Sequence, residues 1–192
     1  MKTLITSVLL ALSALHFLGC GPKTDSQTQV DGTNDVVTEI PDDTVMNDAT
    51  AEKDAEFAMK AANGGMAEVQ LGEIAQTKGV DPKIKEFGKM MVDDHTKAND
   101  ELKALASAKG IALPAGPDEE TAKAITDVSS KNGRDFDKAY AQQMEKDHEK
   151  TVKLFEDGQE DVQDTEIRAF IDKTLPVLRS HLEQSRNLNK RK

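Results

Sequence analysis

Apolar residues recur at helical spacing through most of the chain after residue 50, and no segment there alternates as a β-strand does. Spacings of three and four residues place such positions on one face of a helix. The composition of this part, rich in Ala, Lys, Glu, Leu and Met, also favours helices. The pattern predicts four long helices and one short extra helix, over residues 51–78, 82–109, 118–131 (the short one), 134–157 and 164–189.

Turn residues mark the boundaries of these helices. Asp81 followed by Pro82 supplies a capping side chain and a proline at the first helical position of the second helix. Gly110 is the expected C-terminal cap of the same helix, and the third long helix is expected to end near Gly158. Pro176 falls inside the last helix, where it predicts a kink.

The connection between the second and third long helices covers residues 111–132. A connection of this length can cross a bundle from end to end, because an extended chain covers about 3.3 Å per residue. A simple up-and-down array would need only a short loop at this point. We therefore predict an all-α fold over residues 51–192, a ferritin-like four-helix bundle whose long crossover carries the short extra helix.

Each predicted inward stripe carries one ionisable residue near its middle, namely Glu68, His95, His148 and His181. Counting residues from the helix ends places Glu68 and His95 within about 5 Å of each other along the axis. His148 lies level with His95 if their two helices run parallel. The same count displaces His181 from His148 by about 10 Å. The sequence thus predicts one polar level, with His181 off it.

A short sequence repeats around the first two of these histidines. Residues 91–97 and 144–150 both fit Met-x-x-Asp-His-x-Lys. Met and His four residues apart share a helix face, so Met91 and Met144 are expected beside their histidines. The aspartate directly before each histidine points elsewhere and cannot orient the ring of its own neighbour.

The first twenty residues have the pattern of a bacterial lipoprotein signal. Lys2 precedes an apolar stretch over residues 4–18, which is shorter than the roughly 20 residues of a membrane-spanning helix. The stretch ends in FLGC, which resembles a lipobox, so residues 1–19 are the expected signal peptide and Cys20 the acylated residue. Gly21 then favours the outer membrane, facing the periplasm. An ordinary secretory signal with a chance cysteine is the alternative.

The segment that follows, up to residue 50, is acidic and lacks any apolar period. Residues 21–50 contain seven carboxylates against the single Lys23. Such a segment cannot bury enough apolar surface to offset the entropy of ordering it. We therefore expect residues 20–50 to be a lipid-attached, disordered tether that holds the helical domain away from the membrane.

Charge and composition exclude several classes of function. The chain has 35 acidic and 25 basic residues, and only 4% of it is aromatic. The acidic balance repels phosphate and few rings could stack on bases, so no nucleic-acid partner is expected. The single cysteine excludes an intramolecular disulfide and a multi-cysteine zinc site. The membrane, reached through the N-terminal lipid, is the expected partner, and the sequence identifies no protein partner.

The helical part of the chain resembles a known family through several motifs. They are AEVxLGxIA at residues 67–75, FGKMMVDDHTKAN at 87–99, FDxxY at 136–140, MxxDH at 144–148 and LPxLxxHL at 175–182. Over residues 54–189 the chain is similar to the Domain of Unknown Function 4142 family, a ferritin-like group common among bacterial exported proteins and lipoproteins. The resemblance implies the fold and brings no established reaction.

Two explanations fit the four inward ionisable residues. In the first they form a polar core layer that bonds internally and fixes helix register, which makes the chain a binding or structural module of the envelope. In the second they hold a transition metal, because imidazole and carboxylate suit copper, zinc, iron or nickel. Met91 and Met144 would then be accessory soft ligands that favour copper(I), or simply fill gaps in the core. Glu145 is a further accessory candidate.

Enzymatic chemistry is a third hypothesis, and no catalytic residue is assigned. Ferritin-like di-iron sites use two Glu-x-x-His pairs, whereas here only Glu145 and His148 have that spacing. Val92 and Leu178 stand three residues before the other two histidines. A redox enzyme would therefore need an altered ligand set. No phosphate-binding loop or zinc-peptidase motif is present in the sequence.

Overall fold

The computed structural model describes residues 48–190. The expected signal peptide, Cys20 and nearly all of the expected tether lie outside these residues. The described part is all-α, with helices α1 (Asp48–Lys78), α2 (Pro82–Ala108), α3 (Glu119–Ser129), α4 (Gly133–Asp161) and α5 (Thr165–Asn189). No helix of this part combines the length and apolar character needed to cross a membrane.

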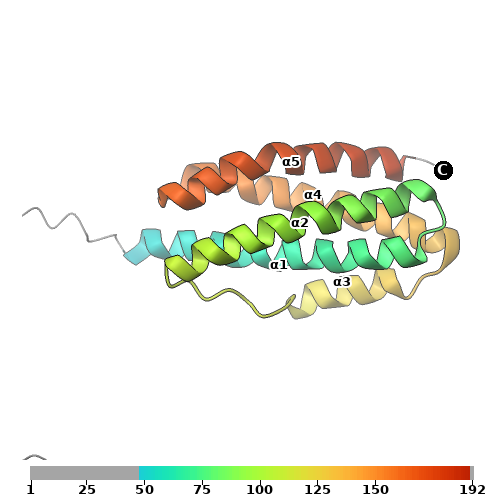
Figure 1. The fold of residues 1–192 in the computed structure, drawn as a ribbon, viewed down its shortest axis with the longest axis horizontal. Helices are drawn as coiled ribbons and strands as arrows, with labels where there is room; N and C mark the ends of the chain where they lie inside the picture. Colours follow the sequence, from blue (N-terminus) through green and yellow to red (C-terminus); the bar gives the residue numbers. More distant parts are fainter. Residues whose placement is uncertain (1–47, 191–192) are drawn as a thin grey trace, which may run out of the picture. The chain divides into compact units, whose positions relative to one another are not determined.

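The four long helices lie side by side, with α3 outside them (Figure 1). α1 packs mainly on α2, and α4 on α5; contacts between α1 and α4 and between α2 and α5 join the two pairs. α1 and α5 run in one direction and α2 and α4 in the other, because the connection through α3 returns the chain to the opposite end (Figure 1). The parallel course of α2 and α4 is the condition under which His95 and His148 share a level.

Capping side chains begin three of the helices, and the cap of α2 is the one that the sequence predicts. The carboxylate of Asp81 accepts a hydrogen bond from the backbone N–H of Lys83, and Asp164 accepts bonds from two backbone N–H groups of the first turn of α5. Asp118 caps α3 in the same way. Asp54, which is buried in α1, accepts bonds from the N–H groups of residues 163 and 164 and so ties α1 to the α4–α5 loop.

Two helix ends differ from the prediction. α1 begins at Asp48, three residues before the expected start. α4 continues past Gly158 to Asp161, although a glycine there was expected to end it. Gly158 leaves room for its neighbours, because a Cβ atom at this position would stand 3.0 Å from the ring of Phe57 and from Ile171. Pro176 lies within the continuous helix α5.

Two glycines face each other where α1 packs against α2. A Cβ atom on Gly72 of α1 would lie 2.6 Å from the carbonyl oxygen of Gly88 on α2. The absence of side chains therefore lets the two backbones touch. This contact fixes α1 against α2 one turn from Glu68 and two turns from His95.

The core consists of two apolar clusters with a polar layer between them. One cluster gathers Phe57, Phe155, Phe170 and their aliphatic neighbours, and the other gathers Leu71, Met91 and the residues around them. Each long helix contributes one buried ionisable residue to the junction of these clusters. The layer consists of Glu68, His95, His148 and His181, all at most 5% exposed.

Candidate metal centre

Three histidines from three helices converge in the polar layer. His95 comes from α2, His148 from α4 and His181 from α5, and one ring nitrogen of each lies within 4.8 Å of the other two. Their ring centroids are 5.4–5.6 Å apart. We call these three residues the histidine cluster. They converge because each occupies the inward face of an amphipathic helix whose other inward residues are apolar.

The outer nitrogen of each ring faces an acceptor. Nδ1 of His148 donates to the carbonyl oxygen of Met144 at 2.9 Å, one turn earlier in α4. Nε2 of His181 donates to the carboxylate of Asp94 on α2 at 3.0 Å. Nδ1 of His95 stands 3.0 Å from the carboxylate of Glu68, which also approaches Nδ1 of His148 at 3.5 Å. The Glu68 contacts are close but lack the angles of good hydrogen bonds.

The remaining nitrogen of each ring has no hydrogen-bond partner among the described residues. These atoms are Nε2 of His95, Nε2 of His148 and Nδ1 of His181. A neutral imidazole that donates through one nitrogen presents a lone pair on the other. The outer partners therefore assign the tautomers of His148 and His181, so each of these rings presents a buried lone pair. Nε2 of His95 is the third buried ring nitrogen without a partner.

Burial controls the ionisation of the whole layer. It raises the pKa of Glu68 well above its usual range, and the charge of nearby Asp147 adds to this. It lowers the pKa of His95 well below its usual value, and that of His148 to about 4. The pKa of His181 is also lowered by burial, although Asp94 opposes the shift. At neutral pH the three rings are therefore uncharged, the form that binds metals.

His181 belongs to the cluster, and the sequence-based prediction of a 10 Å offset is wrong. The count assumed that α4 ends near Gly158. The helix in fact ends at Asp161, thirteen residues after His148, and α5 starts at Thr165, sixteen residues before His181. The difference of three residues corresponds to about 4.5 Å, which side-chain length can span.

The accessory candidates lie elsewhere. Met91 and Met144 are fully buried in the apolar cluster with Leu71, and Met144 contributes its backbone carbonyl to His148. Glu145 turns toward the C-terminal part of α5, where its carboxylate accepts a bond from Asn189 and approaches Arg186. Its spacing from His148 therefore does not bring it to the cluster.

Three neighbours of the cluster are not predicted from the sequence. Asp94 cannot orient the ring of His95, the next residue, yet it orients His181 on another helix. The ring of Phe87 lies edge-on to His148 and His181, with centroids 6.3 and 6.4 Å away. Tyr140 is fully buried, and its hydroxyl has no partner within the described part of the chain. Of these three neighbours, only Phe87 has a signal in the sequence, because it lies two turns before His95 on the same helix face.

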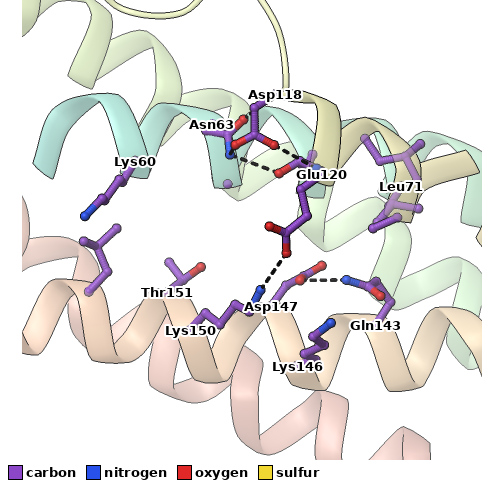
Figure 2. A pocket seen from close by; sticks show the side chains of 16 residues that line it. Lys60, Asn63, Leu71, Asp118, Glu120, Gln143, Lys146, Asp147, Lys150 and Thr151 are labelled. Carbon is purple, nitrogen blue, oxygen red and sulfur yellow. Dashed lines mark hydrogen bonds and ion pairs between the residues drawn. The ribbon is translucent and has the colours of Figure 1, made fainter. Parts of the chain in front are cut away.

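A cavity of about 300 Å³ lies beside the layer, between α1, α3 and α4. Its polar groups mostly pair with one another: Asn63 binds Asp118, Gln143 binds Asp147, and Lys150 approaches Glu120 (Figure 2). We call it the α3 cavity. Asp147 is its innermost carboxylate, and burial raises the pKa of this group. None of these pairs involves a ring of the histidine cluster.

Comparisons with known proteins give a family and a fold. A family model described as "Domain of unknown function (DUF4142)" matches residues 41–188. No protein of curated function matches the sequence. Among solved structures, the chain is similar to one described as "CopM in the Cu(I)-bound form", with a TM-score of 0.58 and 14% identity. The match covers 70% of this chain and 93% of that one. At this identity the likeness concerns the fold alone.

Proposed function

This chain belongs to the Domain of unknown function 4142 family, whose description names no activity, and we propose from its geometry that it binds copper through the histidine cluster. One observation carries the proposal. The three rings offer nitrogens within 4.8 Å of one another, and each ring has one buried nitrogen without a partner in the described residues while its other nitrogen faces an oxygen atom. Metal-ligating histidines are usually held by such outer partners.

A purely structural layer explains this arrangement less well. Buried polar atoms left without a hydrogen bond cost about 1–3 kcal/mol each. A layer selected only for register would be expected to pair its ring nitrogens with one another or with Glu68. Ligands at zinc–nitrogen bond lengths of about 2.0–2.1 Å stand roughly 3.3–3.4 Å apart in a tetrahedral site. Small inward shifts of the rings would therefore bring them to bonding distance of an ion.

Charge balance favours copper(I) among the candidate ions. Burial disfavours the ionised form of Glu68 in the metal-free protein, and a bound cation would displace its proton and leave one negative charge beside three neutral imidazoles. A monovalent cation makes the layer neutral, whereas a divalent one leaves a positive charge buried. Imidazole nitrogen suits copper. The structural similarity to a protein described in a Cu(I)-bound form adds support for this choice.

An anaerobic copper(I) titration tests the proposal. The full chain carrying Cys20→Ala, which removes the only thiol, is titrated against the chelator bicinchoninate. We expect one ion per chain and a rise in melting temperature. A ligand at 100 times its dissociation constant stabilises a protein by about 2.7 kcal/mol. Zinc, titrated in parallel, should bind more weakly.

Variants locate the ion. His95→Ala, His148→Ala and His181→Ala should each abolish the copper-dependent rise. Tyr140→Phe is the matched control, since it removes another buried, unpartnered polar atom but no ring nitrogen. An unchanged melting temperature with copper and zinc, together with destabilised apo variants, would support the structural layer instead.

We further propose a ferritin-like bundle for the described domain. Two antiparallel helix pairs joined by a long crossover, with α2 and α4 parallel, support this topology (Figure 1).

We also propose that the chain is an exported lipoprotein of the outer membrane, acylated at Cys20. The support is the sequence pattern of residues 1–21. The protein should label with fatty acid and fractionate with membranes, whereas Cys20→Ala should move it into the soluble periplasmic fraction. Unlabelled protein with unchanged fractionation would refute the anchor.

A further inference from the structure

Among the outer partners of the histidine cluster, one reaches the surface. Glu68, beside His95, is 1% exposed, and the carbonyl that binds His148 belongs to the fully buried Met144. Asp94, by contrast, holds His181 while its own side chain is 46% exposed. The shortest polar connection between the cluster and the surface, among these contacts, therefore runs through His181 and Asp94.

A second cavity lies on this side of the domain, between α2 and α5. It has a volume of about 540 Å³ and is lined by Phe87, Met90, Asp93, Asp94, Gln184 and Leu188, among others. We call it the α5 cavity. Its inner wall is the ring of Phe87, the same ring that packs edge-on against His148 and His181. The Phe87 ring and the carboxylate of Asp94 thus contact the cluster and line the cavity as well.

The lining of the α5 cavity suits a soft cation. It carries three carboxylates, including Asp93 and Asp94, and two lysines. One of those lysines, Lys89, is already paired with Asp93. The thioether of Met90 lies 3.7 Å from the side-chain amide of Gln184 within the same lining. Thioether sulfur is a preferred ligand of copper(I).

The α3 cavity, between α1, α3 and α4, differs in its charge and in the pairing of its side chains. It is lined by three carboxylates and three lysines, one lysine more than the α5 cavity. Its polar side chains are largely paired with one another (Figure 2). Its innermost carboxylate, Asp147, binds Gln143 of its own helix and no cluster histidine. A cation would therefore find no excess negative charge there and no cluster ring to receive it, whereas the lining of the α5 cavity has one carboxylate more than its lysines.

We infer that copper(I) reaches the cluster, and leaves it, through the α5 cavity, passing from Asp94 and Met90 to His181. This inference rests on the proposed copper site. His181 is the ring that moves, because its outer bond is to an exposed carboxylate while the outer partners of the other two rings are buried. Asp94 is a positioning residue: it receives the ion outside and holds the ring inside.

Matched glutamine variants test the route. Gln184→Lys places a positive charge in the α5 cavity, and Gln143→Lys places the same charge in the α3 cavity. The full chain carrying Cys20→Ala receives copper(I) as its acetonitrile complex, and unbound ion is captured by excess bicinchoninate at timed intervals. Circular dichroism confirms that each variant is folded.

We expect Gln184→Lys to slow both uptake and release at least fivefold, so that the dissociation constant changes less than either rate. Gln143→Lys should leave both rates within twofold of the parent. Met90→Leu, which keeps the volume and removes the sulfur, should slow uptake two- to fivefold. Equal rates in all variants, or a larger effect of Gln143→Lys, would overturn the route. Absence of copper uptake by the parent protein would instead overturn the proposed function.

Discussion

The two Met-x-x-Asp-His-x-Lys segments share their Met, Asp, His and Lys residues but have different surroundings. In α2, Asp94 reaches across to His181 of α5, and His95 faces Glu68 of α1. In α4, Asp147 binds Gln143 of the same helix, and His148 binds the carbonyl of its own preceding turn. The first segment thus makes its polar contacts with other helices, whereas the second makes most of them within α4.

The difference arises from the neighbouring helices. α2 lies against α5, so the residue before its histidine finds a ring to bind. α4 has α1 and α3 beside the corresponding position, and Asp147 there faces the α3 cavity (Figure 2). A repeated sequence therefore places two histidines in the same cluster, but the groups that surround the two rings differ.

The largest expected effect is acid instability of the apo protein. The folded-state pKa of His148 is about 4, below its unfolded value of about 6.5, so its contribution to stability is present above pH 6.5 and lost as the pH falls toward 4. A shift of that size corresponds to about 3 kcal/mol. Glu68 has the opposite sign, because its raised pKa makes the folded state gain stability as the pH falls.

Melting curves between pH 7.5 and 4 measure this effect. His95→Gln and His148→Gln should both flatten the pH dependence, because both rings have lowered pKa values. Bound copper should move the acid transition to lower pH. A pH dependence equal to that of the parent in both variants would contradict the buried neutral rings.

The next largest effect concerns how tightly α1 packs against α2 and against α4, the helices that carry the two segments. Gly72→Ala would place a methyl group 2.6 Å from the backbone oxygen of Gly88, and we expect a loss of about 1–3 kcal/mol in the free energy of unfolding. Gly64→Ala faces α4 instead, where the nearest atom is Thr151 Oγ1 at 3.7 Å. It should stabilise the helix by up to about 1 kcal/mol. Chemical denaturation of the two variants measures the change in the free energy of unfolding. Equal changes in both would contradict the tighter packing of α1 on α2.

Glu68 stands between the two segments, and Glu68→Gln tests its charge. The carboxamide keeps the shape but removes a carboxylate that burial destabilises when ionised. We expect unchanged or higher apo stability at neutral pH, together with a copper(I) affinity about 10- to 100-fold lower. A variant that binds copper as tightly as the parent would remove the charge-balance argument.

The smallest expected effect is that of removing the charge of Asp147. Asp147 raises the pKa of Glu68 through its charge, so Asp147→Asn should lower the Glu68 pKa and change apo stability by only a few tenths of a kcal/mol. NMR titration of the Glu68 carboxyl signal follows this directly. Asp93→Asn, on the exposed face of α2, is the control. A larger shift in the control would contradict the proximity of Asp147 to Glu68.

Much of this protein follows from its sequence. Apolar residues at helical spacing and turn residues such as Asp81, Pro82 and Gly110 are local features, so they predict the five helices to within a few residues. The same periodicity places Glu68, His95 and His148 on inward faces, because a polar residue within an apolar stripe is carried into the core with it.

Only the tertiary structure decided which groups meet. The level of His181 relative to His148 depends on how far α4 continues beyond Gly158. This glycine makes room for neighbouring side chains and does not end the helix. The partnership of Asp94 with His181 depends on α5 lying beside α2, and Glu145 faces Arg186 despite its favourable spacing. Helical periodicity fixes the direction of a side chain relative to its own axis. The rotation and neighbours of that axis are set by packing between helices, where the space left by residues such as Gly72 and Gly158 determines the fit.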